Sequence, residues 1–256
     1  MTVINTNVNS LTAASTLAIN ERKLSSAMEQ LSTGKRINSA KDDAAGQGIA
    51  SRMTAQIRGL DQAVRNANDG ISMLQTADGA MEEVSNMLQR MRELAIQHES
   101  DTNATADLAA LSTEYAALSS EITRINSDTT WNSKELFAAG TVSLQVGANS
   151  GDVIAVAITD FALTGTISTI GAIDTDIDNI NTYRSTLGAG INRLTYAANN
   201  SLSISANTSA SRSRIQDTDY AKVSAELART QIVQQAATAM LAQANQGAQS
   251  VLALLK

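Results

Sequence analysis

The sequence predicts a mainly α-helical protein, a long antiparallel, coiled-coil-like helix bundle with paired N- and C-terminal helices and a small β-hairpin cap. Three observations lead to this fold class. Apolar residues recur at three, four and seven positions over long segments. The 256 residues include no proline, the commonest helix breaker. Aromatic residues make up only 3%, so the core must be aliphatic and alanine-rich, which favours close packing of helices.

The N-terminal segment carries almost no charge. Residues 1–20 contain no ionisable side chain, yet they keep a helical apolar pattern with Asn, Ser and Thr between the apolar positions. That pattern is typical neither of a membrane span nor of a disordered tail. Leucines recur every seven residues at 17, 24 and 31, and Ala14 and Met28 are interleaved with them. We expect a helix that packs against another segment of the protein.

The C-terminal segment, also uncharged from 230 to 255, predicts a helix with more than one buried side. One face of this helix is formed by positions that step by fours and threes, namely Val223, Leu227, Thr230, Gln234, Ala237, Leu241, Ala244, Ala248, Val251 and Leu255. Val233, Met240, Leu252 and Leu254 widen its apolar stripe. Burying the large apolar side chains after 230 contributes roughly 12 to 24 kcal/mol. Ordering the segment costs on the order of 40 kcal/mol. The segment therefore needs the other terminus and neighbouring copies of the chain.

The longest helix is expected in the first half of the chain, after a joint near residues 34–40. Gly34 fits a helix C-terminus, and Ser39 to Asp42 has capping-box spacing for a new helix. The helix itself is predicted by a heptad of Met53, Leu60, Ala67, Leu74, Met81, Leu88 and Ala95. Asn68-Asp69-Gly70 resembles a turn, but the heptad continues through it. The methionines at 53, 81 and 91 are interpreted as core filler.

The remaining elements complete an antiparallel arrangement. Polar residues 98–103 interrupt the pattern before a shorter helix over 108–125, and residues 131–137 are expected to be irregular. Residues 141–147 and 152–158 predict a β-hairpin. A third long helix starts near Ile173 and runs toward Ser211, and an acidic joint at 217–219 precedes the last helix. We expect an inner domain formed by 1–40 and 213–256, and an outer helical domain over 41–212 with the hairpin at about 138–160.

Composition excludes several classes of function. The net charge is −6 and the basic residues are scattered, which argues against nucleic-acid and anionic-membrane partners. The absence of cysteine excludes disulfides and thiolate metal sites. The N-terminus does not resemble a cleaved secretory signal, so export would use another route. We expect no cofactor, no bound metal and no enzymatic activity.

Few residues suggest chemistry. His98 is the only histidine, which excludes a two-histidine zinc motif, and we interpret it as a solvated hinge residue. Asp174, Asp176 and Asp178 alternate as in a calcium loop but lack its glycine and its final glutamate, so we interpret them as acidic residues at a helix N-terminus. For Lys41-Asp42-Asp43 two interpretations stay open, an intersubunit charge cluster and a solvated helix start.

Long ordered segments at both ends closely resemble bacterial flagellin, the subunit of the flagellar filament. The matching segments are INTNV at 4–8, LSTGKRINSAKDDAAGQGIA at 31–50, NDGISMLQTADGAMEEVSNMLQRMRELAIQ at 68–97, RSTLGAGINRL at 184–194, SRIQDTDYA at 213–221 and QIVQQAATAMLAQANQGAQSVLALLK at 231–256. Matches of this length are far more specific than a short motif. The chain has only about 35 residues, 138–172, where many flagellins insert a large outer domain.

The resemblance implies a self-assembling, extracellular protein of the flagellar filament. It implies terminal helices that line the filament channel, a helical domain that forms the outer tube, and unfolded export through the flagellar type III apparatus without a cleaved signal peptide. The implied partners are further copies of the chain, an export chaperone on the C-terminal helix, and the filament cap and hook-filament junction proteins.

The resemblance also implies a surface that an animal Toll-like receptor detects in similar flagellins. The matching residues are Leu88, Gln89, Arg90, Leu94, Gln97 and Glu114. Arg90, Leu94 and Gln97 lie on neighbouring turns of one predicted helix. Contacts between subunits within the filament are the alternative role of these residues, and both roles are compatible.

The sequence thus predicts a non-enzymatic structural subunit that polymerises through non-closing contacts. The expected self-assembly core is Leu11, Leu17, Leu24, Leu31, Leu227, Val233, Met240, Leu241, Val251, Leu252 and Leu255. The alternatives are a hook-filament junction protein of the same superfamily and a surface-associated ligand-binding homologue that uses the β cap or an interhelical groove. An enzymatic variant is disfavoured because the middle segment is too short for a catalytic insertion.

Overall fold

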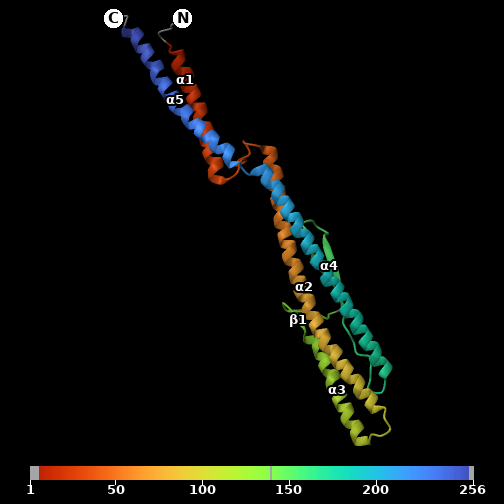
Figure 1. Cartoon of the computed structure of the whole chain (residues 1–256). Coiled ribbons are helices and arrows are strands. Elements are labelled where there is room, and N and C mark those ends of the chain that lie inside the picture. The colour runs from red at the N-terminus through yellow and green to blue at the C-terminus, as the bar shows by residue number, and fades with distance from the viewer. Residues whose placement is uncertain (1–5, 139, 254–256) are drawn as a thin grey trace. The chain divides into compact units, whose positions relative to one another are not determined.

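The computed structural model describes residues 6–138 and 140–253, with side chains up to Gln246 in the last helix. This part of the chain is mainly helical, and the predicted fold class is confirmed (Figure 1). The elements are α1 Val8–Thr33, α2 Ala44–His98, α3 Thr105–Asp128, β1 Thr130–Trp131, β2 Lys134–Glu135, β3 Gly140–Gln145, β4 Val153–Ile158, α4 Ile170–Gln216 and α5 Tyr220–Ala253.

The chain packs as two compact units. One contains the chain up to Thr54 and from Thr208 onward, and the other contains Ala55–Asn207. We call them the terminal unit and the middle unit. The functional domains expected from the sequence, with boundaries at 40 and 213, stay a prediction. None of the helices in the described ranges is both long and apolar enough to cross a membrane.

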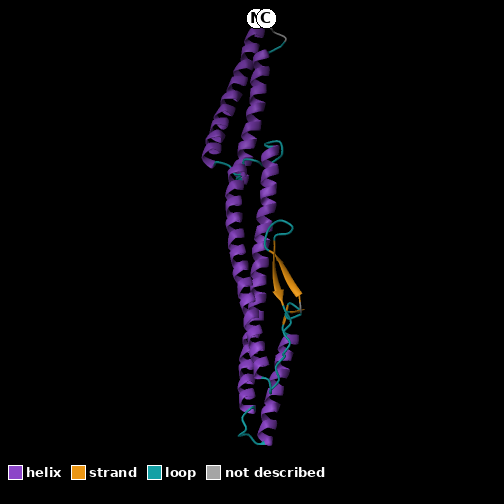
Figure 2. Cartoon of the chain, turned by 90° about the vertical axis from the view of Figure 1, so that its right-hand side faces the viewer, coloured by secondary structure: helices purple, strands orange, loops and turns teal. Residues whose placement is uncertain are grey.

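In the terminal unit, α1 and α5 lie side by side in opposite directions (Figures 1 and 2). Asn7 caps α1, because its Oδ1 accepts a hydrogen bond from the Ser10 amide at 3.1 Å. The Asn7 amide group also donates to the Ala244 carbonyl at 3.0 Å, near the other end of the chain. The predicted pairing of the N- and C-terminal helices is confirmed.

The expected joint after the first helix is also confirmed. Gly34 ends α1 in the left-handed conformation, with φ of 69°, and a Cβ there would lie 2.9 Å from the Tyr220 hydroxyl. The segment after Gly34 pairs with the one that precedes α5. The Arg36 amide donates to the Gln216 carbonyl at 2.7 Å, and the Thr218 amide donates to the Gly34 carbonyl at 3.0 Å. Backbone hydrogen bonds therefore clip the two linkers together.

The start of α2 differs from the prediction. Ser39 does not cap the helix, because α2 begins at Ala44 and the Asp43 carboxylate accepts from the Gly46 amide at 2.8 Å. Asp42 instead closes the preceding turn. Hydrogen bonds donated by the Ser39 amide and hydroxyl lower the pKa of Asp42, and the Asn38 amide contributes less. Capping-box spacing marked the right region but assigned the wrong residue.

The middle unit contains a continuous aliphatic core between α2, α3 and α4, which lie side by side in Figures 1 and 2. The predicted heptad supplies one side of this core, and its members from Leu60 to Ala95 are buried. Met81 and Met91 are buried as core filler, as predicted. The remaining fully buried large side chains include Val84, Leu94, Ile122, Leu136, Phe137, Ile173, Leu187 and Leu194.

The predicted hairpin is confirmed as β3 and β4, whose antiparallel register runs from Gly140 opposite Ile158 to Gln145 opposite Val153. The hairpin contacts α2 at Gly70, where a Cβ would overlap the Leu144 side chain. Gly70 therefore belongs to a continuous helix and leaves room for the hairpin, which explains a turn-like motif inside α2. Residues 131–137, expected to be irregular, instead contribute to the short β1–β2 ladder, with Asn132 and Ser133 at positive φ in its turn.

Residues 159–169 form an irregular segment that crosses from β4 to α4, and we call it the strap. Asp176 is buried and holds the strap, because its carboxylate accepts from the Thr164 amide and hydroxyl at 3.0 and 2.6 Å and from the Gly165 amide at 2.9 Å. The Tyr115 hydroxyl donates to the Gly165 carbonyl at 2.9 Å. The strap is thus fixed by polar groups on α3 and α4.

The prediction that the three aspartates lie at the N-terminus of a helix is wrong. The first turn of α4 contains no acidic residue. Asp174 accepts a hydrogen bond from Arg92 on α2, and Asp176 binds the strap, so tertiary partners explain these two carboxylates. Asp178 is exposed.

We expect Asp176→Ala to lower the free energy of unfolding of the middle unit by about 3 kcal/mol, because the amide and hydroxyl donors of the strap lose a buried, charged acceptor. Trp131, the single tryptophan, lies in this unit and reports its unfolding through fluorescence in a urea titration. Asp178→Ala is the matched control and should leave the midpoint unchanged. Equal midpoints for both variants would contradict the role of Asp176.

The middle unit should also lose stability at alkaline pH. Burial raises the pKa of Tyr115, with a smaller contribution from the charge of Asp176, and burial raises the pKa of Tyr183. The unfolded phenols ionise near pH 10, so their contribution is complete below that pH and is lost as pH rises through the folded values. Urea titrations between pH 8 and 11 should show a smaller alkaline loss in Tyr115→Phe/Tyr183→Phe than in the wild type. Equal losses in both proteins would contradict this linkage.

Candidate assembly surface

The faces that α1 and α5 turn toward each other are only partly apolar. Among their described side chains, those classed as fully buried are Asn20, Ala27 and Thr230. The leucines at 17, 24 and 31 are half-buried, and so are Leu227 and Leu241 on α5. Ala14 and Met28, which the sequence interpretation interleaved with these leucines, are exposed. Asn20 and Ala27 occupy the inner positions instead.

The outer faces of the same two helices carry large apolar side chains in water. Leu11 is 61% exposed, Ile232 is 65% exposed and Met240 is 64% exposed. Among the side chains described on these helices, the exposed large apolar residues are Val8, Leu11, Ile19, Met28, Ile232, Val233 and Met240, together with the aromatic Tyr220. We call the seven aliphatic and methionine residues the outer stripes. We take these helices as the candidate assembly surface because they leave large apolar side chains in water.

Six of the seven outer-stripe residues lie where the sequence has no charge, and Met28, next to Glu29, is the exception. The segments 6–20 and 230–246 contain no ionisable side chain, and the Arg229–Glu226 pair at 3.3 Å precedes the second segment. A neighbouring helix could therefore cover these six residues without removing an ion from water. This distribution of charge favours contacts through the uncharged segments of the two helices.

The predicted self-assembly core divides into three groups. Leu17, Leu24, Leu31, Leu227 and Leu241 lie on the inner faces and stabilise the α1–α5 pair. Leu11, Val233 and Met240 belong to the outer stripes. The positions Val251, Leu252 and Leu255 lie outside the described side chains. The sequence predicted apolar helices but did not distinguish inner from outer positions.

The predicted receptor surface is only partly on the surface. Leu88 is 1% exposed and Leu94 is fully buried in the core of the middle unit, while the other four residues are exposed. Arg90 bridges two helices, with 2.9 Å hydrogen bonds to Glu93 on α2 and Glu114 on α3. Both hydrogen bonds raise the pKa of Arg90, and the bond to Glu93 has the larger effect. Leu88 is itself a member of the heptad, so the sequence contained the signal for its burial.

His98 differs from the solvated hinge residue that was expected. It is the last residue of α2, it is half-buried, and its Nδ1 is buried without a hydrogen-bond partner. No group of three metal-ligating side chains occurs within the described ranges.

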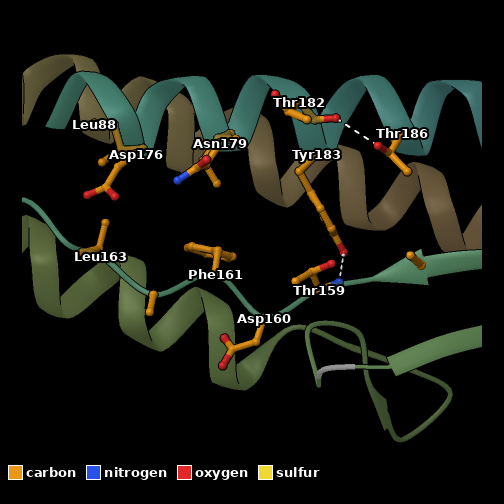
Figure 3. A pocket seen from close by; sticks show the side chains of 13 residues that line it. Leu88, Thr159, Asp160, Phe161, Leu163, Asp176, Asn179, Thr182, Tyr183 and Thr186 are labelled. Carbon is orange, nitrogen blue, oxygen red and sulfur yellow. Dashed lines mark hydrogen bonds between the residues drawn. The ribbon is translucent and has the colours of Figure 1, made fainter. Parts of the chain in front are cut away.

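Two cavities lie in the middle unit. One, of about 420 Å³, separates α4 from the strap, and Asn179 and Phe161 face it from opposite sides (Figure 3). Two of its polar side chains make structural contacts, since Asp176 binds the strap and the Tyr183 hydroxyl accepts from the Thr159 amide at 2.8 Å. The other, of about 790 Å³, lies beside the β1–β2 turn and β3. Their geometry indicates packing around the strap and hairpin.

Comparisons with known proteins agree with the arrangement of the helices. Residues 4–142 match the bacterial flagellin N-terminal helical region, and residues 170–255 match the bacterial flagellin C-terminal helical region. The chain is 46% identical over 271 residues to a flagellin of Halalkalibacterium halodurans, covering 99% of this chain and 100% of that protein. It is 32% identical over 375 aligned residues to flagellin A of Vibrio anguillarum, covering 99% of each.

A solved structure is similar as well. The crystal structure of Bacillus cereus flagellin aligns with a TM-score of 0.50 and 31% identity, over 54% of this chain and 88% of that chain.

Substitutions should separate the buried from the exposed residues of the predicted receptor surface. Leu94→Ala leaves a cavity in the core and should lower the free energy of unfolding by about 2 to 5 kcal/mol. Arg90→Ala removes exposed hydrogen bonds and should leave the Trp131 unfolding midpoint close to that of the wild type. A stable Leu94→Ala variant would contradict the described packing of α2.

Proposed function

Because this chain belongs to the bacterial flagellin family, we propose that it is the repeating subunit of a flagellar filament and that the α1–α5 pair is its polymerisation element. Flagellins are structural, non-enzymatic proteins. The observation that carries the proposal is the set of outer stripes, seven large apolar residues left in water on two helices that contain few charges. A second copy of the chain is the occupant we assign to this surface.

The energies favour such an occupant. Burying a fully exposed large apolar side chain contributes about 1.5 to 3 kcal/mol, and the seven residues are 37 to 65% exposed, so covering them contributes roughly 6 to 11 kcal/mol before the cost of association. The inner contacts of the α1–α5 pair contribute less than a typical helix interface, because the fully buried side chains are one alanine and two polar residues. Assembly would therefore add most of the stabilisation of the terminal helices.

In the proposed polymer, each subunit makes the same contacts with the next one, and the series of subunits does not close into a ring. When one face of a subunit binds a different face of the next, and the rotation does not close a ring, the product is an open helical polymer. The α1 and α5 stripes are different in sequence, which suits contacts of this heterologous kind. The polymer would serve motility as an extracellular flagellar filament.

The other partners stay predictions of the family resemblance. They are the export chaperone on the C-terminal helix, the filament cap, the hook-filament junction proteins and the Toll-like receptor. Export without a cleaved signal peptide also stays a prediction of the family resemblance. For the receptor, Gln89, Arg90, Gln97 and Glu114 are the accessible residues, and Leu88 and Leu94 would act by supporting the helix.

Two alternatives make different predictions for the purified chain. A hook-filament junction protein would not grow into long filaments by itself, whereas a filament subunit should do so after seeding. A ligand-binding homologue should bind a ligand saturably at the β cap, and substitutions there should abolish that binding.

We expect Leu11→Ser/Met240→Ser to raise the critical concentration for polymerisation by about fivefold or more per residue, because each change removes roughly 1 to 2 kcal/mol of apolar burial. The monomer should keep its helical circular dichroism, since both side chains are exposed before assembly. Sedimentation and electron microscopy after seeding measure the polymer. Removal of residues 237–256 should abolish polymerisation and leave a soluble helical monomer.

Thr12→Ser is the matched control for that experiment. Thr12 is exposed on α1, and serine can keep the hydrogen bond that its hydroxyl donates to the Val8 carbonyl. The control should polymerise as the wild type does. Normal polymerisation of the double variant would refute the role of the outer stripes, and failure of the seeded wild type would refute the filament role itself.

A further inference from the structure

A buried polar contact lies midway along the α1–α5 pair. The Asn20 side-chain amide donates a 2.8 Å hydrogen bond to the Thr230 carbonyl, and both residues are buried. The Thr230 hydroxyl bonds back to the carbonyls of Glu226 and Leu227, both at 2.9 Å, which turns it away from the carbonyl that Asn20 reaches. The amide donor of Asn20 and the carbonyl of Thr230 therefore form a bonded pair at the centre of the interface.

Leucines flank Asn20 on the inner face of α1, and on α5 Thr230 lies between Leu227 and the half-buried Gln234. Leu17 and Leu24 lie one turn before and after Asn20, and Leu227 lies one turn before Thr230. In this register the two buried polar residues share one layer of the interface. A slip of one heptad, about 10 Å along the helices, would place Asn20 opposite Val223 or Ala237. The Asn20 amide would then lose the Thr230 carbonyl as its acceptor and lie opposite an apolar residue, whereas the Thr230 hydroxyl would keep its bonds within α5.

Apolar pairing cannot select a register between these helices. Leucine recurs every seven residues on α1, and small or apolar residues recur at three and four positions on α5, so slipped registers also bring apolar residues together. The clipped linkers fix the register only for an α1 and an α5 of the same chain. Where α1 meets the α5 of another copy, as in a growing polymer, side chains alone decide.

We infer that Asn20 and Thr230 form a register lock, a polar layer that specifies the axial register of α1 against α5 at a cost in the stability of the pair. The lock fixes how the outer stripes of the two helices are aligned. In assembly it disfavours slipped pairings between copies, and this part of the inference rests on the proposed function.

Cysteine cross-linking can read the register, because the chain has no cysteine of its own. Ser10→Cys/Asn245→Cys reports the observed register, in which the Ser10 hydroxyl lies 2.9 Å from the Asn245 side-chain oxygen. Ser10→Cys/Thr238→Cys reports a register slipped by one heptad. Each pair is made in the full chain with Asn20 retained and with Asn20→Leu, and is oxidised both as the dilute monomer and during seeded growth.

With Asn20 retained, the first pair should close and the second should stay reduced. With Asn20→Leu, closure of the second pair should rise at least about fivefold, chiefly as intermolecular bonds formed during growth, because leucine suits every register. The monomer of Asn20→Leu should at the same time unfold at higher urea. A purely structural asparagine would change stability without changing the register.

Two variants complete the test. Asn20→Ala removes the amide without adding a large apolar group, and it should also increase slipped cross-links. Asn9→Leu makes the same chemical change at an exposed position of α1 and should not. Retention of the observed register alone in both Asn20 variants would overturn the inference. Failure of the seeded wild type to grow would instead count against the filament role, and the monomer cross-links would still report the register.

Discussion

The terminal helices cannot bury their own apolar side chains on each other, and the other properties of the protein depend on this constraint. In the middle unit, α2 and α4 enclose a continuous aliphatic core that α3, the hairpin and the strap complete. In the terminal unit, α1 and α5 meet through half-buried leucines and the Asn20–Thr230 contact, while their outer stripes face water. One chain thus combines a unit that has its own aliphatic core with a unit that we propose is stabilised by association.

Apolar packing alone would allow several arrangements of the helices, and in each unit polar groups select one of them. In the middle unit the carboxylate of Asp176 fixes the strap, and a glycine at position 70 lets the hairpin lie against α2. In the terminal unit, backbone hydrogen bonds near Gly34 hold the linkers together. Leucine and alanine would fill many helical arrangements about equally well, so these contacts select one arrangement among several of similar apolar burial.

Much of the fold could be predicted because apolar periodicity reports burial: the heptad indicated a continuous helix through Asn68-Asp69-Gly70, and two-residue alternation on either side of a turn indicated the hairpin. Local features were less predictable. The cap of α2 moved from Ser39 to Asp43, since several polar residues in a joint can cap a helix. On α1, leucines at 17, 24 and 31 fit an inner face with either Met28 or Ala27, and only the partner helix decides. The assembly residues were identified as apolar, but their division into inner and outer faces depends on tertiary packing.

The turn between β3 and β4 has a separate consequence for engineering. Residues 148–151 are exposed, Gly151 supplies the positive φ, and the bond from the Val146 amide to the Asp152 carbonyl closes the ladder beneath them. A foreign epitope spliced between Asn149 and Ser150 would leave the strand register and the helical core intact. The chain therefore offers a compact scaffold for peptide display, with an insertion point in the middle unit and not on the helices that carry the outer stripes.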